Sequence, residues 1–437
     1  MKVLIVGAGL GGIACGIACR RQGLDVTILE RAPELSEIGA GIQVPPNACR
    51  ALDYIGVFEK VKSKATEVLV RHLRRWDNGN VLATRKYGPV SYGKYGYPAM
   101  VIHRADLQQA LLETAAELGV KIQTGCDVMN ANFEATEVIL TDGQRFRADV
   151  IVGADGIWST LRSQVVGQAI DPTETGDLAY RGTFTRQQLE ELDDAEVIRF
   201  CDENKQTLTL WLGPLKHAVF YAIRGGELWN LVLLTPDRMK KGQRTEKGDL
   251  AEMCREFEGW DPILTKITTC FSSTLKWKLC HHSELQTWVK HKFVLLGDSA
   301  HPTLPYQSQG AAMAFGDAAV LGALLGRFSK TSKEKLEASG MTLPKILDIF
   351  ESLQKPYSTL NVKGAATNRI MYHLPNGEEQ RQRDMEFSGM TSESQSEWTW
   401  IDGEYQRHII GTDLVRMAMD KFDSEVNADG QGLEVSP

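Results

Sequence analysis

The sequence lacks the features that mark several special classes of protein. Its 437 residues contain no run of about 18 apolar residues, so no membrane-spanning helix is expected. No basic run occurs either, and 49 Lys plus Arg against 56 Asp plus Glu give a formal net charge of −7. We therefore expect no nucleic-acid partner. With 43% hydrophobic and 24% charged residues, the composition is that of an ordinary globular protein, which excludes intrinsic disorder.

The cysteines also lack any pairing pattern. The eight of them are scattered and include no C-x-x-C pair, which favours reduced thiols over a disulfide framework or a zinc site. The histidines show no ligand spacing, and no metal is expected. Met1-Lys2 leads directly into an apolar strand without a secretory signal, and the tail Glu434–Pro437 has no lipidation box. The expected location is cytoplasmic.

The length corresponds to two or three structural units at about 100–200 residues per domain. Strands and helices alternate at the N-terminus, whereas short strand-like runs separated by Gly and Pro turns dominate from 177 to 280. We expect an α/β fold with a Rossmann-like nucleotide-binding domain, an inserted antiparallel β-sheet and a C-terminal helical region. The expected boundaries are 1–70, 98–176 and 281–330 for the nucleotide domain, 71–97 and 177–280 for the sheet, and 331–437 for the helical region.

Some local elements are predicted by periodicity and turn chemistry. An Asp-Gly turn between Glu137–Leu140 and Gln144–Arg147 predicts a β-hairpin. Leu343–Leu360 has the apolar spacing of an amphipathic helix. The polar and charged stretch Gly377–Gln395 is expected to be an exposed loop.

The first motif is a G-x-G-x-x-G turn between a predicted strand and a predicted helix. Gly7 permits the tight turn, Gly9 lets the backbone approach a pyrophosphate, and Gly12 allows close packing of helix and strand. Glu30 follows eighteen residues after Gly12, at the end of the second strand, where its carboxylate can accept ribose hydroxyls. Because strand, helix and acid all occur together, we interpret this turn as a dinucleotide site that disfavours a 2′-phosphate.

The second motif is Asp155-Gly156 at the end of the predicted strand Asp149–Gly153. This strand delivers Asp155 to the carboxyl edge of the sheet, where ligands of such folds bind. A purely structural alternative is a strand–turn–helix junction in which Ser159 is the helix N-cap. The sequence leaves both interpretations open.

The third motif is Gly297-Asp298 with the Pro- and Gly-rich loop that follows it. Asp298 again stands at a strand end and can bind a polyol hydroxyl. The loop runs into an apolar, Ala-rich helix beginning near Ala311, whose positive end suits a developing anion. A helix-capping loop with a buried Asp is the alternative.

Together the three motifs resemble the single-component FAD-dependent aromatic hydroxylases, group A flavoprotein monooxygenases, and most closely their salicylate hydroxylase-like branch. Glu34–Ile42 (ELSEIGAGI) and Val101–Leu107 (VIHRADL) also match that family, and the resemblance runs from residue 2 to about residue 365. It implies an FAD-binding domain with a substrate-binding inserted sheet. NADH or NADPH would be a transient co-substrate, and dioxygen would react as a flavin C4a-hydroperoxide.

The resemblance also assigns residues. It places twelve residues in the FAD site, where they would contact the ADP moiety, the phosphates, the ribityl chain or the flavin ring. They are Gly7, Gly9, Leu10, Gly12, Glu30, Arg31, Gly41, Arg104, Asp155, Asp298, Gly310 and Ala311. This chain departs from the family where Ser308-Gln309-Gly310-Ala311-Ala312 replaces Gly-Gln-Gly-x-Asn. Backbone N–H groups would then replace an Asn side chain. No second G-x-G-x-x-G exists, so the choice between the two nicotinamide coenzymes is not readable.

The substrate-side candidates are Arg181, His217, Tyr221 and Pro305. The family has an arginine at the place of Arg181 that can pair with a substrate carboxylate or phenolate, although a strand Arg can equally form a surface ion pair. His217 and Tyr221 share one face of a predicted strand, where His can move a proton and Tyr can hold a phenol oxygen. Simple cross-strand packing is the alternative for both.

We therefore expect an NAD(P)H-dependent monooxygenase that hydroxylates a small phenolic or hydroxybenzoate-like aromatic substrate, as a monomer or homodimer. The rivals are an FAD-dependent epoxidase, a halogenase or another oxidoreductase of the same fold, an NAD dehydrogenase and a non-enzymatic interaction protein. A halogenase would need a Gly-Trp-x-Trp-x-Ile-Pro block, but the Trp-x-Trp at Trp398-Thr-Trp400 lacks the glycine and the proline.

Overall fold

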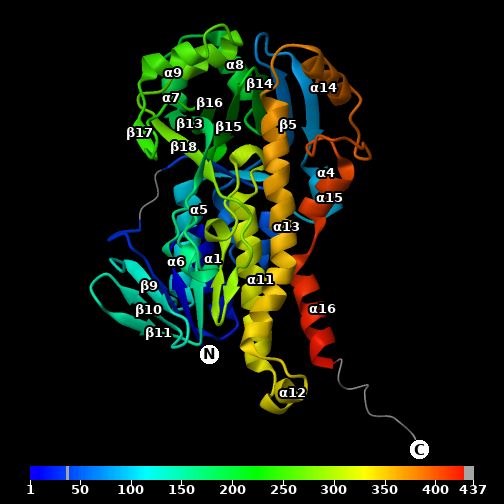
Figure 1. Ribbon diagram of the computed structural model, residues 1–437. Coiled ribbons are helices and arrows are strands. Elements are labelled where there is room, and N and C mark those ends of the chain that lie inside the picture. Colours follow the sequence, from blue (N-terminus) through cyan, green and yellow to red (C-terminus); the bar gives the residue numbers. More distant parts are fainter. Residues whose placement is uncertain (36–38, 428–437) are drawn as a thin grey trace, which may run out of the picture.

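The computed structural model describes residues 1–35 and 39–427. Residues 36–38, which belong to the Glu34–Ile42 match, and residues 428–437, which include the tail Glu434–Pro437, lie outside the described residues. The chain forms two sheet-based halves, and the long helix α13 (Leu343–Tyr372) runs beside both of them (Figure 1).

The first half is built on a six-stranded sheet. Its neighbouring strands are parallel except for the edge pair β19–β20. Val3, Ile5 and Val152 are buried, as expected for strands covered on both faces. This confirms the predicted α/β fold. The strand order is β19 (Val289–Lys290), β20 (Phe293–Leu295), β12 (Val150–Gly153), β1 (Lys2–Val6), β2 (Asp25–Leu29) and β8 (Lys121–Gln123).

Helices α1 and α11 pack closely against each other beside this sheet. A side chain at Gly322 of α11 would come within 2.6 Å of the Ala18 side chain of α1, so glycine allows the close approach. Among the described residues, α11 is the one helix whose length and composition would let it cross a membrane, but 78% of its apolar stretch is buried. The helices of this half are α1 (Leu10–Arg21), α2 (Pro46–Tyr54), α3 (Phe58–Lys64), α4 (Pro89–Tyr95), α5 (Arg104–Glu117), α6 (Thr160–Val166) and α11 (Gly310–Lys330).

The second half is built on an eight-stranded sheet. All of its pairs are antiparallel except β14–β5, which is parallel. A tight hairpin would make β5 and β14 antiparallel. Because β5 and β6 come from an earlier segment of the chain, no hairpin joins β5 to β14, and a parallel pair is possible. The strand order is β17 (Thr245–Lys247), β18 (Leu275–His281), β13 (Thr173–Thr185), β16 (Leu228–Pro236), β15 (Lys216–Ile223), β14 (Thr207–Gly213), β5 (Val70–Arg75) and β6 (Val81–Lys86).

The two faces of this sheet have different roles. One face packs a buried aromatic core against four short helices; within it the rings of Phe220 and Trp229 stack 4.9 Å apart. The opposite face carries Arg181, His217 and Tyr221, which are candidates for the site. The covering helices are α7 (Arg186–Glu190), α8 (Ala195–Glu203), α9 (Leu250–Glu256) and α10 (Pro262–Thr268).

The remaining strands of the described chain form two three-stranded sheets. One contains the predicted hairpin, which the structure confirms, with Gly143 at a φ of +86° in its turn. The other places β3 beside β7, next to the candidate site. Their strands are β9 (Val128–Asn132), β10 (Glu137–Leu140) and β11 (Arg145–Arg147), then β3 (Gly41–Val44), β7 (Met100–His103) and β4 (Thr66–Glu67).

The C-terminal region is helical, and here one local prediction was wrong. The expected exposed loop Gly377–Gln395 contains a helix, α14, whose Gln380, Arg383 and Phe387 are buried. Its Glu, Gln and Arg residues favour helix, and its buried face is largely polar, so no apolar period marked it. The helices after α11 are α12 (Lys333–Ala338), α13, which extends the predicted helix by about three turns, α14 (Glu378–Ser388), α15 (Gly403–Gly411) and α16 (Leu414–Asn427).

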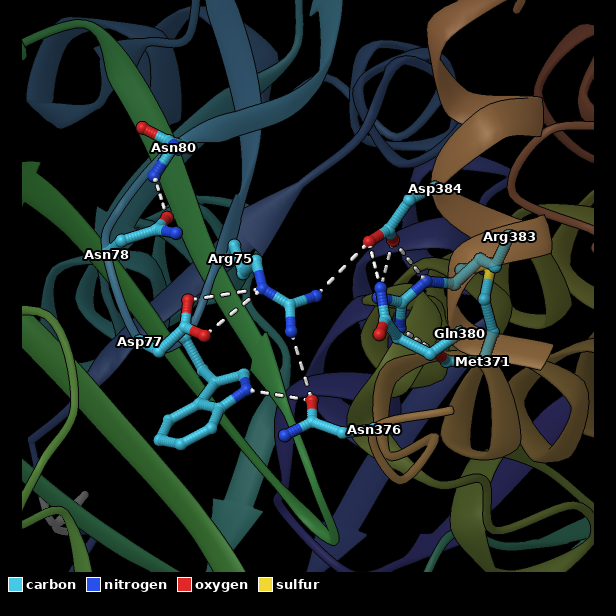
Figure 2. Close-up of polar contacts among 10 residues, drawn as sticks. Arg75, Asp77, Asn78, Asn80, Met371, Asn376, Gln380, Arg383 and Asp384 are labelled. Carbon is cyan, nitrogen blue, oxygen red and sulfur yellow. Dashed lines mark hydrogen bonds and ion pairs between the residues drawn. The ribbon is translucent and has the colours of Figure 1, made fainter. Parts of the chain in front are cut away.

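Polar contacts join α14 to the hairpin of β5 and β6 (Figure 2). The Arg75 guanidinium contacts Asp77, Asp384 of α14 (3.4 Å) and the Asn376 side chain (3.1 Å). Asp384 also accepts hydrogen bonds from Arg383. These contacts hold the C-terminal region against the sheet.

Candidate functional site

The glycine turn between β1 and α1 has the geometry of a phosphate cradle. Gly7 has a φ of +105°, and a side chain there would come within 2.3 Å of the Ala154 carbonyl oxygen. A side chain at Gly12 would come within 2.0 Å of the Gly7 carbonyl oxygen. Gly9, by contrast, faces open space at the N-terminus of α1, where backbone N–H groups favour an anion. Leu10 is buried as the first residue of that helix.

Glu30 lies beside this turn, immediately after β2. Its two carboxylate oxygens accept hydrogen bonds from the backbone N–H of Ala8 (2.7 Å) and of Ala32 (2.8 Å). The contact with Ala8 ties the acid to the glycine turn itself. Arg31 is exposed next to it. The carboxylate of Glu30 therefore lies directly beside the glycine turn.

The second motif has the predicted structural role of a strand–turn–helix junction. Asp155 accepts hydrogen bonds from the Ser159 hydroxyl (2.6 Å) and the backbone N–H of Thr160 (2.8 Å). Ser159 in turn caps α6 by accepting from the Arg162 N–H, so the predicted N-cap is confirmed. Burial raises the pKa of Asp155 against the lowering effect of these hydrogen bonds. The Asp155 carboxylate therefore holds the first turn of α6 in place.

Arg162, which sequence reasoning did not single out, joins the second motif to the third. Its guanidinium is almost fully buried and donates to the backbone carbonyls of Ile157 and Asp298. Its Nε atom has no hydrogen-bond partner in the part of the chain that the structure describes. Burial lowers the pKa of Arg162, whereas the nearby carboxylates of Asp155, Asp298 and Asp171 raise it, so this buried cation lies between the acids of the second and third motifs.

Asp298 of the third motif is accessible to solvent at the end of β20. Desolvation by the surrounding protein raises the pKa of its carboxyl, against the lowering effect of His301, Arg104 and Arg162. The predicted alternative of a buried Asp does not apply to Asp298. That structural role belongs to Asp317, which is fully buried and accepts from the Gly297 N–H (2.9 Å) and the His301 ring (2.6 Å).

The loop before α11 brings the helix N-terminus to the same region. Pro305 opens a short 3₁₀ turn, and Ser308 adopts a left-handed conformation with a φ of +60°. Gly310 and Ala311 then begin α11, whose first N–H groups have no intrahelical partners. The loop therefore leads directly into the free N–H groups at the N-terminus of α11.

On the sheet side, β3 contacts the face of the eight-stranded sheet that carries Arg181, His217 and Tyr221, which we call the open face because none of the four covering helices packs on it. The Gly41 N–H donates to the Asn230 side chain (2.7 Å), and a side chain at Gly41 would come within 2.6 Å of the Tyr221 hydroxyl. Asn230 is fully buried, and its Nδ2 atom has no hydrogen-bond partner in the described part of the chain. The lone polar residue in the apolar run Leu228–Leu234 was a sequence signal for Asn230 that was missed.

Arg181 lies close to Tyr221 and Arg104. Burial and the positive charge of Arg104 lower the pKa of Arg181, whereas Tyr221 raises it. Burial raises the pKa of Tyr221, so its hydroxyl is neutral at pH 7. Within residues 1–35 and 39–427, Arg181 forms no ion pair, and its Nε atom is buried without a hydrogen-bond partner. The surface ion-pair alternative for Arg181 is therefore not observed.

His217 lies on the same strand as Tyr221 but in a different environment. It is buried, and its Nδ1 atom lies 2.8 Å from Nε2 of His373 at the end of α13. Desolvation and the charge of His373 lower the pKa of His217 well below its usual range. The Tyr306 ring packs 5.3 Å from the His217 ring, and the Tyr306 hydroxyl donates to Asp177. Sequence reasoning missed His373 because 156 residues separate it from His217.

A cavity of about 300 Å³ lies next to this face. It is bordered by β3, by β5 and β6, by the loop before α11 and by the C-terminal region. Neither Arg181 nor His217 lines it. Among the residues that the structure describes, no group of three or more His, Cys, Asp or Glu side chains is placed to hold a metal ion, and the eight cysteines are all free.

Comparisons with known proteins agree with this geometry. The family model described as "FAD binding domain" matches residues 1–339. The FAD-dependent monooxygenase OpS4 of Beauveria bassiana (strain ARSEF 2860) is 36% identical over 96% of both chains. The 3-hydroxybenzoate 6-hydroxylase 1 of Aquipseudomonas alcaligenes is 35% identical over 75% of this chain and 81% of its own. A salicylate hydroxylase substrate complex shares the fold, with a TM-score of 0.78 at 21% identity over 96% of this chain and 97% of that chain. The chain therefore belongs to the FAD-binding-domain family and is an FAD-dependent monooxygenase.

Proposed function

We propose that this monooxygenase uses NADH or NADPH to hydroxylate a phenolic or hydroxybenzoate-like aromatic substrate. In the balanced reaction, the nicotinamide coenzyme and one proton reduce dioxygen, one oxygen atom enters the ring C–H bond, and the other leaves as water. The observation that carries the proposal is the group formed by Arg181, Tyr221 and Asn230 at the contact between β3 and the sheet. The relative named for 3-hydroxybenzoate supports this substrate class.

The residues of the three motifs fit FAD. The open space in front of Gly9, the carboxylates of Glu30 and Asp298, and the start of α11 offer phosphate, hydroxyl and anion contacts in one region. We assign Arg31, Arg104 and Asp155 to the same cofactor site, with Gly310 and Ala311 at the flavin ring. Bound FAD supplies electron transfer and oxygen activation.

The sheet residues prepare the substrate. An electron-rich phenolate ring reacts more readily with an electrophilic oxygen than a phenol does, and Arg181 stabilises that anion by its charge. Tyr221 keeps its own proton because its pKa is raised by burial, so it donates a hydrogen bond to the substrate oxygen. Asn230 offers a further donor from its Nδ2 atom, which has no hydrogen-bond partner in the described part of the chain.

His217 is the residue that can take the phenol proton. Its lowered pKa keeps the ring neutral at pH 7, so one ring nitrogen can accept a proton. His373 holds the other side of the ring through the 2.8 Å contact. Pro305 shapes the loop that carries Tyr306 into contact with this pair. We also propose that FAD binds in the domain formed by residues 1–70, 98–176 and 281–330, and that the substrate binds in the sheet domain of residues 71–97 and 177–280.

The experiment is to purify the protein, record its visible spectrum and measure NADH and NADPH oxidation, oxygen uptake and product formation with hydroxybenzoates and alkyl phenols. We expect bound flavin, and coenzyme oxidation that rises when one of these aromatics is added. A flavin-loaded protein whose oxidation of both coenzymes no phenol stimulates would contradict the proposal.

A further inference from the structure

The cavity beside the sheet contains cations without anions. Arg71 of β5 and Arg85 of β6 both line it, and Lys86 and Lys94 line it from exposed positions. Within residues 1–35 and 39–427, no Asp or Glu lines it. Its volume of about 300 Å³ falls at the lower end of the range for small-molecule sites.

In the part of the chain that the structure describes, Arg71 and Arg85 have neutral hydrogen-bond partners. Arg71 donates to the Gln43 side chain (2.8 Å), and its buried Nε atom has no partner in the described chain. Arg85 donates to the Gln406 side chain (2.7 Å) and to the Trp400 carbonyl. Burial lowers the pKa of Arg85, and the nearby positive charge of Arg71 lowers it further against three tyrosine phenols that raise it. Half-buried cations without a carboxylate favour an anionic ligand.

Aromatic rings hold both guanidinium groups in place. The Arg71 guanidinium lies 5.7 Å from the centre of the Tyr87 ring, and that of Arg85 lies 4.3 Å from the Trp400 ring. Such cation–π contacts restrict the planar guanidinium group, which can bind a carboxylate with two hydrogen bonds. Apolar residues such as Leu208 and Ile409 line other parts of the wall and suit an aromatic ring.

The cavity adjoins the proposed reaction site through two segments. β3 supplies Gln43 to the cavity and, two residues earlier, Gly41 to the contact with Tyr221 and Asn230. The loop before α11 supplies Ser308 and Gln309 to the cavity and continues into Gly310. A ligand in the cavity would therefore lie against the same strand and loop that border the flavin and sheet residues.

We infer that this cavity binds the carboxylate of an aromatic acid, with Arg71 and Arg85 as the residues that determine specificity for acids over neutral phenols. The inference rests on the proposed function, because it names the substrate class of that reaction. It assigns the carboxylate to β5 and β6, whereas Arg181 acts on the phenol oxygen.

The test is calorimetric titration of the flavin-loaded protein with benzoate and with benzyl alcohol, which has the same ring without the charge. The variants are Arg71→Gln, Arg85→Gln and the charge-retaining Arg71→Lys. Arg199→Gln is the matched control, because it removes an exposed positive charge from α8 on the other face of the sheet. Thermal melting of each variant shows whether it folds.

We expect wild type and Arg199→Gln to bind benzoate more tightly than benzyl alcohol. Arg71→Gln should weaken benzoate binding about ten- to a hundredfold and leave benzyl alcohol within about twofold, with Arg71→Lys in between. The inference is overturned if wild type does not prefer benzoate, if both glutamine variants keep the wild-type affinity for it, or if both ligands weaken equally. Calorimetry needs no turnover, so absent coenzyme oxidation with intact benzoate selectivity would refute the proposed reaction and not this site.

Discussion

His217 Nδ1 and His373 Nε2 lie 2.8 Å apart, so the middle of the open sheet face is tied to the C-terminal end of α13. One ring donates to the other, which requires that both stay neutral or share a single proton. Burial lowers the pKa of His373 to about 4 and that of His217 well below its usual value. The pair therefore carries no charge at neutral pH.

This pair predicts a loss of stability in mild acid. The unfolded chain binds protons at these histidines near pH 6.5, but folded His373 binds one only near pH 4. Their contribution to the free energy of unfolding is complete above pH 6.5 and is lost as the pH falls from 6.5 towards 4. For His373 alone the loss is on the order of 2 kcal/mol at pH 5. Urea unfolding at pH 7.5 and pH 5 should show a smaller difference for His373→Gln than for wild type. The exposed His291→Gln is the control, and equal differences in all three proteins would contradict the prediction.

The glycine turn predicts two different outcomes for two similar substitutions. Gly12→Ala places a methyl group 2.0 Å from the Gly7 carbonyl oxygen, so the turn must shift and stability should fall by about 1–3 kcal/mol. Gly9→Ala meets no atom within 4 Å, so the protein should fold normally but hold less flavin, because the methyl group occupies the approach of the pyrophosphate. Thermal melting and flavin absorbance per protein separate the two effects. Full flavin content in Gly9→Ala would contradict the assignment.

Asp298→Ala should fold but bind flavin more weakly. Removing one charge-assisted acceptor should reduce flavin affinity about ten- to a hundredfold in a titration of the apoprotein. Glu134→Ala removes an exposed negative charge elsewhere and should not change the affinity. An affinity equal to wild type in Asp298→Ala would contradict the assignment of Asp298 to the cofactor site.

Arg75 is the residue of the β5–β6 hairpin that contacts α14 and the segment before it (Figure 2). Arg75→Ala removes the contacts to Asp384 and Asn376, so α14 should loosen and the protein should lose about 1–3 kcal/mol of stability. Arg381→Ala removes only the contact with exposed Glu378 on the same helix and should cost about 0.5 kcal/mol or less. Urea unfolding and limited proteolysis of the C-terminal region measure the difference. Equal stability of the two variants would show that Arg75 does not hold α14.

Sequence reasoning predicted what depends on local pattern. Gly7 and Asp298 belong to short motifs in which strand, turn and helix are consecutive, so their positions in the fold followed directly from the sequence. Residues brought together by tertiary contacts were not predictable in this way. Arg71 reaches the site through a parallel pairing of β5 with β14, and His373 through the end of a long helix. Helix α14 was missed because its buried face is largely polar, and its polar groups find partners far away in the sequence, such as Arg75 for Asp384.

The last prediction concerns Arg181 and the reaction itself. Arg181→Ala should keep bound flavin and its spectrum, because the three motifs that we assign to FAD do not include this residue. It should lose the stimulation of NAD(P)H oxidation by a phenolic substrate, because the phenolate loses its stabilising charge and the ring becomes less electron-rich. Tyr221→Phe should lose less activity, since a hydrogen bond rather than a charge is removed. The measurements are coenzyme oxidation, oxygen uptake and product formation, with Arg199→Gln as the control.

The result of that experiment separates two arrangements of the site. If Arg181→Ala hydroxylates its best substrate at the wild-type rate, Arg181 does not stabilise the phenolate, and the anion must be held by other residues of the open sheet face. Asn230 would then be the next candidate, since its unpaired amide lies beside Tyr221 and the Gly41 N–H. If activity is lost while flavin stays bound, the arginine acts on the substrate and not on the cofactor. Arg181 would then act on the phenolate oxygen, and Arg71 on the carboxylate that distinguishes a hydroxybenzoate from a simple phenol.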